Sequence, residues 1–214
     1  MQITWYGHSC FLLTAEDGYK ILTDPCDQET GYMLHDIVCD TVTVSHDHFD
    51  HNCLSSVAGS PQVIRTSGDH RAGKIPVTGF PTFHDEQHGA KRGGNIVFRY
   101  EIDGLRLLHL GDLGHMLSDE LIAEIGPVDV LFAPIGGIFT IDAVTATKLA
   151  DKLDVRVFIP MHYKTPALHF DVEGLEPLLN ANEGRSIHHV NENTCTLTPD
   201  SLGECRLLIL DYKR

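Results

Sequence analysis

The residues best suited to chemistry stand in one short run, Ser45-His46-Asp47-His48-Phe49-Asp50-His51. The run follows Thr41–Ser45, whose β-branched residues predict a strand. On an extended segment His46 and His48 point the same way, because alternate side chains share a face. Asp50 and His51 come after a turn, so they can face a second ion. A metal-binding loop is therefore predicted, with four candidate ligands: His46, His48, Asp50 and His51.

Two ions need more ligands than one loop supplies, since zinc prefers about four ligands and a catalytic ion keeps one position open for water. Further ligands must converge from other strand ends. Three residues of ligand type stand where apolar segments are expected to end: His84, Asp112 and His162. His84 is preferred over His70 and His88 because it directly follows Thr82-Phe83, a candidate strand end.

The elements that must position these residues are many short strands and a few helices. Asp17-Gly18 and Asp103-Gly104 are typical hairpin turns. Strands are expected at Ile3–Tyr6, Phe11–Leu13, Tyr19–Leu22, Thr41–Ser45, Ile96–Ile102, Leu105–Leu110, Val128–Phe132, Val155–Ile159, Ser186–Val190 and Cys205–Leu210. Helices are expected after a capping Ser118, from Ile141 to about Leu153, and from Asp171 to Asn180. This inventory favours two sheets packed face to face with helices outside.

Composition limits the function further. The chain has 214 residues and a formal net charge of −14, which argues against extended nucleic-acid binding because an acidic surface repels phosphates. No run of about 18 apolar residues predicts a membrane span. The N-terminus lacks a signal-peptide pattern, and no pair of the six cysteines is spaced as CxxC, so we expect a cytoplasmic protein with reduced thiols. Fourteen histidines agree with metal chemistry.

These motifs resemble the metallo-β-lactamase superfamily of binuclear metallo-hydrolases. The resemblance runs along nearly the whole chain, from Ile3-Thr4-Trp5-Tyr6-Gly7-His8 and Thr23-Asp24-Pro25 through the histidine run to Leu110-Gly111-Asp112 and Pro160-Met161-His162. It implies an α+β fold, a four-layer αββα sandwich, in which residues 1–214 form a single domain of two similar halves. Because one fold hosts many reactions, the resemblance says little about the substrate.

The resemblance also implies roles for the candidate residues. One ion would be held by His46, His48 and His84, and the other by Asp50, His51 and His162. Asp112 would bridge the two ions, and Asp24 would brace the histidine loop from behind. Two further residues have open roles. His8 either supports the site or contacts substrate, or else is a structural histidine, and Lys164 either meets an anionic substrate group or is a surface lysine.

The expected function is hydrolysis of a small, anionic ester, lactone or phosphodiester by a metal-bound hydroxide. Two divalent ions about 3.5–4 Å apart can share a water and lower its pKa toward 7. Asp50 would orient that water and carry its proton. Zinc suits these ligands, and manganese or iron would also fit. The alternatives are a di-iron oxidoreductase and a non-catalytic metal-binding relative, and the sequence does not determine the oligomeric state.

Overall fold

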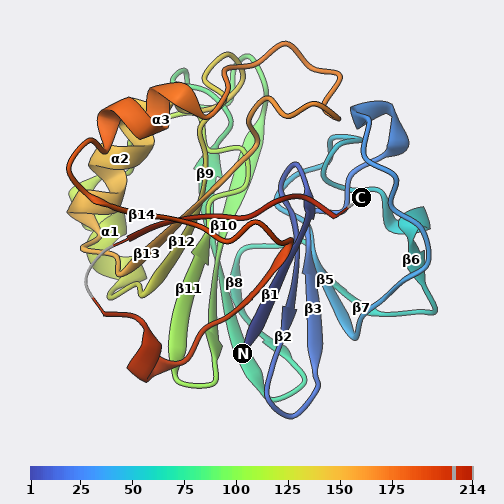
Figure 1. Ribbon diagram of the computed structural model, residues 1–214. Coiled ribbons are helices and arrows are strands. Elements are labelled where there is room, and N and C mark those ends of the chain that lie inside the picture. Colours follow the sequence, from blue (N-terminus) through green and yellow to red (C-terminus); the bar gives the residue numbers. More distant parts are fainter. Residues whose placement is uncertain (204–205, 214) are drawn as a thin grey trace.

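Two β-sheets packed face to face form the centre of the computed structural model, which describes residues 1–203 and 206–213 (Figure 1). The six-stranded sheet has the order β15 (Thr194–Thr196), β1 (Gln2–Gly7), β2 (Cys10–Thr14), β3 (Lys20–Thr23), β5 (Thr41–Thr43) and β7 (Gln62–Ile64). The eight-stranded sheet has the order β14 (Ser186–His189), β16 (Arg206–Ile209), β13 (Val157–Met161), β12 (Val130–Pro134), β11 (Leu105–His109), β10 (Gly94–Ile102), β9 (Ile75–Phe83) and β8 (Gly68–Ala72).

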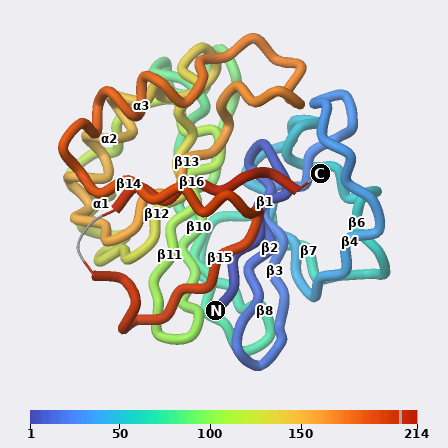
Figure 2. Tube along the Cα trace, viewed as in Figure 1, coloured from blue at the N-terminus to red at the C-terminus, as the bar shows by residue number. Residues whose placement is uncertain are grey.

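The main hydrophobic core fills the space between the sheets. Strand β1 alternates buried and accessible residues, so Ile3 and Trp5 face the core. Phe11 on β2 meets Phe132 on β12 with ring centroids 4.7 Å apart, a direct contact between the two sheets. The C-terminal segment reaches β1 far from the N-terminus, where the Lys213 backbone N–H donates to the Trp5 carbonyl at 2.9 Å (Figure 2).

Three α-helices, α1 (Asp119–Ile125), α2 (Ala143–Lys152) and α3 (Glu176–Ala181), cover the outer face of the eight-stranded sheet (Figure 1). Ser118 caps α1 as predicted, because its side chain accepts from the Leu121 N–H. The third predicted helix was placed too early. Residues 171–175 stay non-helical because the Glu173 backbone bonds to Lys164 and to Gly136, so α3 begins at Glu176 without a side-chain cap.

The outer face of the six-stranded sheet carries a thinner layer. It consists of the 3₁₀ turns η1 (Gln28–Thr30) and η2 (Leu54–Ser56) and the two-stranded sheet of β4 (Ile37–Val38) and β6 (Val57–Ala58). Tyr32, Leu34 and Ile37 pack there against Leu12, Leu22 and Val42 of the sheet in a second apolar cluster. The predicted α+β sandwich is confirmed as a fold class, and this layer holds turns where α-helices were expected.

Each predicted strand is found, with ends within two residues of those expected. Only the end of β9, at Thr82-Phe83, was expected, since Pro76 and Pro81 interrupt this strand and prolines discourage strand assignment. The short strands β4, β6, β7, β8 and β15 were not predicted. Cys205, the first residue of the last predicted strand, lies outside the described residues. The five described cysteines are free thiols. None of the described helices is long and apolar enough to cross a membrane. The two similar halves stay a prediction.

Candidate metal centre

The predicted site residues follow the ends of six strands at one edge of the sandwich. In the six-stranded sheet, β1, β3 and β5 run in the same direction, and His8, Asp24 and the histidine loop follow them. In the other sheet, β9, β11 and β13 share a direction and lead to His84, Asp112 and His162. Parallel strand ends meet at one edge, which explains how residues so distant in sequence converge.

One group of ligand atoms comes from His46, His48 and His84, whose nitrogens lie within 4.8 Å of one another. His46 Nε2 is 3.1 Å from His48 Nδ1. His46 Nδ1 lies 2.9 Å from Ser45 Oγ, which itself donates to Asp24, so His46 Nδ1–H is the donor and Nε2 keeps a free lone pair. This arrangement presents His46 Nε2 to a cation.

A second group combines Asp50, His51 and His162 with His8, again with ligand atoms within 4.8 Å of one another. His51 Nδ1–H donates to Asp24 at 2.9 Å, which turns His51 Nε2 toward Asp50 and Asp112. Asp24 also accepts from the Ser45 N–H and hydroxyl at 2.8 and 2.6 Å. Asp24 thus forms hydrogen bonds with Ser45 and His51 of the loop, and its bracing role stays a prediction.

Asp112 lies between the two groups. Its Oδ2 is 3.1 Å from His84 Nε2 and 3.3 Å from His162 Nε2, and its Oδ1 is 3.1 Å from His51 Nε2. His46 Nε2 lies 3.8 Å from Oδ2, so the carboxylate reaches two histidines of the first group and two of the second. A carboxylate that contacts histidines of both groups is placed where it could bridge two ions.

The donor set fits divalent cations by its chemistry and by its unpartnered atoms. His51 Nε2 and Asp112 Oδ1 are buried and lie 3.1 Å apart, but neither forms a hydrogen bond of regular geometry with a described residue. Buried polar atoms are costly to leave without a partner, and two ions would satisfy both. Imidazole and carboxylate ligands suit zinc, and manganese or iron would also fit. The ligand roles themselves stay a prediction.

The pKa shifts of the candidate ligands also favour cation binding. Burial lowers the pKa of His46 to about 3, and nearby His51 adds to this effect, so His46 is neutral at pH 7. Burial disfavours the charged form of His51, but the carboxylates of Asp112 and Asp50 outweigh it and hold the pKa of His51 well above its usual value. Burial also opposes ionisation of Asp112, yet His162 and His51 keep its pKa well below normal. A bound cation would replace the His51 proton as the partner of these carboxylates.

The backbone at the site is held in uncommon conformations. His8, Asp24 and His162 have positive φ angles of 52°, 37° and 49°, a region that residues other than glycine rarely adopt. Each follows a strand end and turns its side chain inward. Gly114 allows a close approach, since a Cβ there would overlap the backbone of His84 and Asp85. Such strain gathers at functional sites.

Some candidates lie elsewhere. His88 is exposed and packs on Phe83 with ring centroids 5.4 Å apart. His70, on β8, forms a hydrogen bond with the Thr66 carbonyl. Of these three histidines, His84 is therefore the one that joins the cluster. Lys164 does not reach the site. Its ammonium donates to the carbonyls of Leu168, at 2.9 Å, and Phe170, and it stabilises their loop instead of facing a substrate.

Two supporting residues were missed from the sequence. Asn95 on β10 accepts from the Asp112 N–H at 2.9 Å and donates to the Leu110 carbonyl at 2.9 Å, which fixes the loop that carries Asp112. Asp85 accepts backbone N–H bonds from Gln87, Gly89, Lys91 and Arg92 at 2.7–3.0 Å. Both are single polar residues beside apolar segments, and only the fold shows what they contact.

Known proteins share this fold and motif order. A family model described as a beta-lactamase superfamily domain matches residues 2–162. A protein from Thermotoga maritima, described as a Zn-dependent hydrolase of the metallo-β-lactamase superfamily, is 35% identical in sequence. Its structure superposes with a TM-score of 0.81, and the match covers 99% of this chain and 99% of that protein. The chain belongs to the metallo-β-lactamase superfamily. The expectation from the motifs is confirmed.

Relatives within the superfamily carry names of the same kind. A UPF0173 metal-dependent hydrolase of Carboxydothermus hydrogenoformans is 32% identical over 202 residues, which is 80% of this chain and 89% of the relative. Another UPF0173 metal-dependent hydrolase, from Archaeoglobus fulgidus, is 30% identical over 219 residues, covering 85% of this chain and 91% of the relative. This superfamily member is therefore grouped with metal-dependent hydrolases.

His8 supports the site from behind. Its Nε2–H donates to Asp50 Oδ2 at 3.1 Å, and its ring lies 4.1 Å from that of His162 between centroids. Burial lowers the pKa of His8 to about 4, so a neutral imidazole holds Asp50 in place at pH 7. This contact agrees with a supporting role for His8.

We expect His8→Asn to lower turnover about 10–100-fold while two ions per chain are retained, because loss of a residue that orients a ligand has this typical cost. Asparagine tolerates the positive φ but is too short to reach Asp50. Metal analysis and steady-state kinetics on the same preparation provide the measurement. His70→Asn is the matched control and should leave both values unchanged, whereas wild-type kinetics in His8→Asn would show that the contact is not needed.

Proposed function

We propose that this protein hydrolyses a small ester, lactone or phosphodiester with water activated at two divalent ions, zinc being the ion that the ligands suit best. The observation that carries this proposal is the position of Asp112, within 3.3 Å of His84 in one ligand group and of His51 and His162 in the other. A pair of bound divalent ions supplies Lewis acidity and lowers the pKa of a shared water toward 7.

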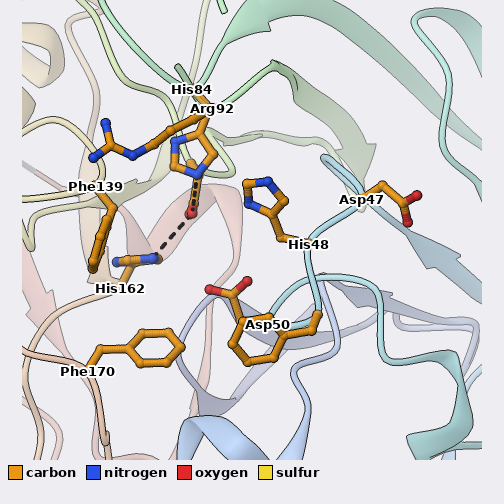
Figure 3. A pocket seen from close by; sticks show the side chains of 10 residues that line it. Asp47, His48, Asp50, His84, Arg92, Phe139, His162 and Phe170 are labelled. Carbon is orange, nitrogen blue, oxygen red and sulfur yellow. Dashed lines mark ion pairs between the residues drawn. The ribbon is translucent and has the colours of Figure 1, made fainter. Parts of the chain in front are cut away.

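The residues of the chain supply the rest of the chemistry. Asp50 belongs to the second ligand group and borders the cavity, so its carboxylate can accept a proton from water and deliver it to the leaving group (Figure 3). Burial opposes its ionisation, but His51 and the hydrogen bond from His8 lower the pKa of Asp50, which keeps the carboxylate ionised at neutral pH. His8 holds the carboxylate in one orientation.

The cavity supports a substrate of small size. It measures about 570 Å³, within the usual range of small-molecule sites, and His48, His84 and His162 border it (Figure 3). The ligand groups thus stand at the floor of an open site, where a substrate can reach them.

The test is a panel of esters, lactones and phosphodiesters offered to protein loaded with zinc, manganese or iron. We expect turnover of at least one class, its loss on chelation, and its return when the metal is restored. Inertness across the panel in protein with two bound ions would indicate a non-catalytic relative. Iron in protein purified without added metal, with visible absorption and no hydrolysis, would instead favour the oxidoreductase.

A further inference from the structure

The wall of the cavity above the metal centre is aromatic. Three phenylalanines line it: Phe49 from the histidine loop, Phe139 from the segment between β12 and α2, and Phe170 from the segment after β13. Phe49 is 50% exposed and Phe139 is 38% exposed, so neither is buried in the apolar core. Exposed rings that gather at one opening are typical of a binding surface.

Each ring packs against a neighbouring side chain. Phe170 packs edge-to-face on Phe49, with centroids 6.0 Å apart, and on His8, with centroids 5.6 Å apart. Phe139 is contacted by Arg92, whose guanidinium carbon lies 5.4 Å from the ring centroid. Figure 3 shows Phe139 and Phe170 on the side of the cavity where His162 lies. The aromatic wall therefore adjoins a candidate ligand.

Arg92 gives this wall a positive charge. Among the described residues that line the cavity it is the only lysine or arginine, and the acidic side chains there are Asp47, Asp50 and Asp112. One guanidinium nitrogen donates to the Ile138 carbonyl at 3.3 Å, which leaves further N–H donors for a ligand. Its backbone N–H bonds to Asp85, so its loop is anchored. A guanidinium beside an aromatic wall fits an anionic, aromatic ligand.

We propose that the substrate carries an aromatic ring that packs against Phe49, Phe139 and Phe170, and an anionic group that Arg92 contacts. This assignment rests on the proposed hydrolytic function, because the reacting bond must then lie at the metal centre beside the aromatic wall. It names a substrate class, aryl-bearing anionic esters or phosphodiesters, and two specificity-determining features, the aromatic wall and Arg92.

The test measures binding of two phosphonates to zinc-loaded protein by calorimetry. Phenylphosphonate should bind about tenfold more tightly than methylphosphonate, since a buried ring contributes more than a methyl group. The double variant Phe139→Ala with Phe170→Ala should reduce this ratio to about twofold or less. Arg92→Ala should weaken both ligands about tenfold and leave the ratio intact, with zinc content unchanged.

Matched controls lie one residue away. Ile138→Ala removes an exposed apolar side chain that does not line this cavity, and Lys91→Ala removes a neighbouring positive charge that also lies outside it. Both should bind as wild type. Equal affinity of the two phosphonates for wild-type protein would overturn the proposal. So would an unchanged affinity ratio in the phenylalanine variant, even if that variant changed its oligomeric state.

The binding readout also separates this inference from the proposed function. A tenfold affinity ratio between the two phosphonates, in protein that hydrolyses no member of the panel, would contradict the proposed hydrolysis and support the binding site. Equal turnover of alkyl and aryl substrates, with equal affinity for the two phosphonates, would support hydrolysis. It would overturn the proposal that the aromatic wall binds the substrate.

Discussion

Asp112→Asn is expected to remove most of the bound metal and to lower turnover by about 10³-fold or more. Asp112 is 1% exposed and its two oxygens face histidines from both ligand groups. An amide has the same shape but no charge, so neither ion would keep its shared anionic ligand. A loss of several kcal/mol of charge stabilisation corresponds to about three orders of magnitude in rate.

Elemental analysis and kinetics measure the two effects, and circular dichroism checks that the fold persists. The matched control is Asp47→Asn, the same substitution at an exposed residue that borders the same cavity and forms an ion pair with Arg65 at 3.2 Å. It should keep two ions per chain and turnover close to that of wild type. If Asp112→Asn also bound two ions and turned over normally, a bridging role for Asp112 would be wrong.

The sequence was sufficient for the parts of the site that are local. The histidine loop follows β5, and His84, Asp112 and His162 follow β9, β11 and β13, as expected from apolar runs that end at a polar residue. Strand ends could be located because periodicity and turn residues act over a few positions. The superfamily motif order then indicated which ends meet.

What the sequence could not predict depends on contacts across the fold. Asn95 fixes the Asp112 loop from 17 positions away, and nothing beside it in the chain indicates that contact. Phe49, Phe139 and Phe170 form one wall from three separate segments. Lys164 is the reverse case. Its position two residues after His162 suggested a contact with an anionic substrate group as one possibility, yet its ammonium donates to the carbonyls of residues 168 and 170.

Asp50→Asn should separate metal binding from proton transfer. The amide oxygen can still coordinate a cation, but the side chain can no longer accept a proton from water. We expect turnover to fall about 10²–10⁴-fold, the usual contribution of a positioned general base, with at least one ion per chain retained and an unchanged circular dichroism spectrum. The His8 N–H still has an oxygen acceptor in this variant, so the bond to His8 can persist.

Excess zinc and a change of leaving group distinguish this mechanism from simple loss of a ligand, and a pH–rate profile checks the titration of Asp50. In the proposed mechanism ionised Asp50 is the base, and His51 and His8 keep its pKa below the usual value, so its own titration should not limit turnover near neutral pH. If Asp50 acts only as a ligand, excess zinc should restore the rate of Asp50→Asn. If it carries the proton, full metal occupancy should leave the rate low, and the defect should shrink for substrates whose leaving group needs no proton, because protonation of the leaving group is then no longer required.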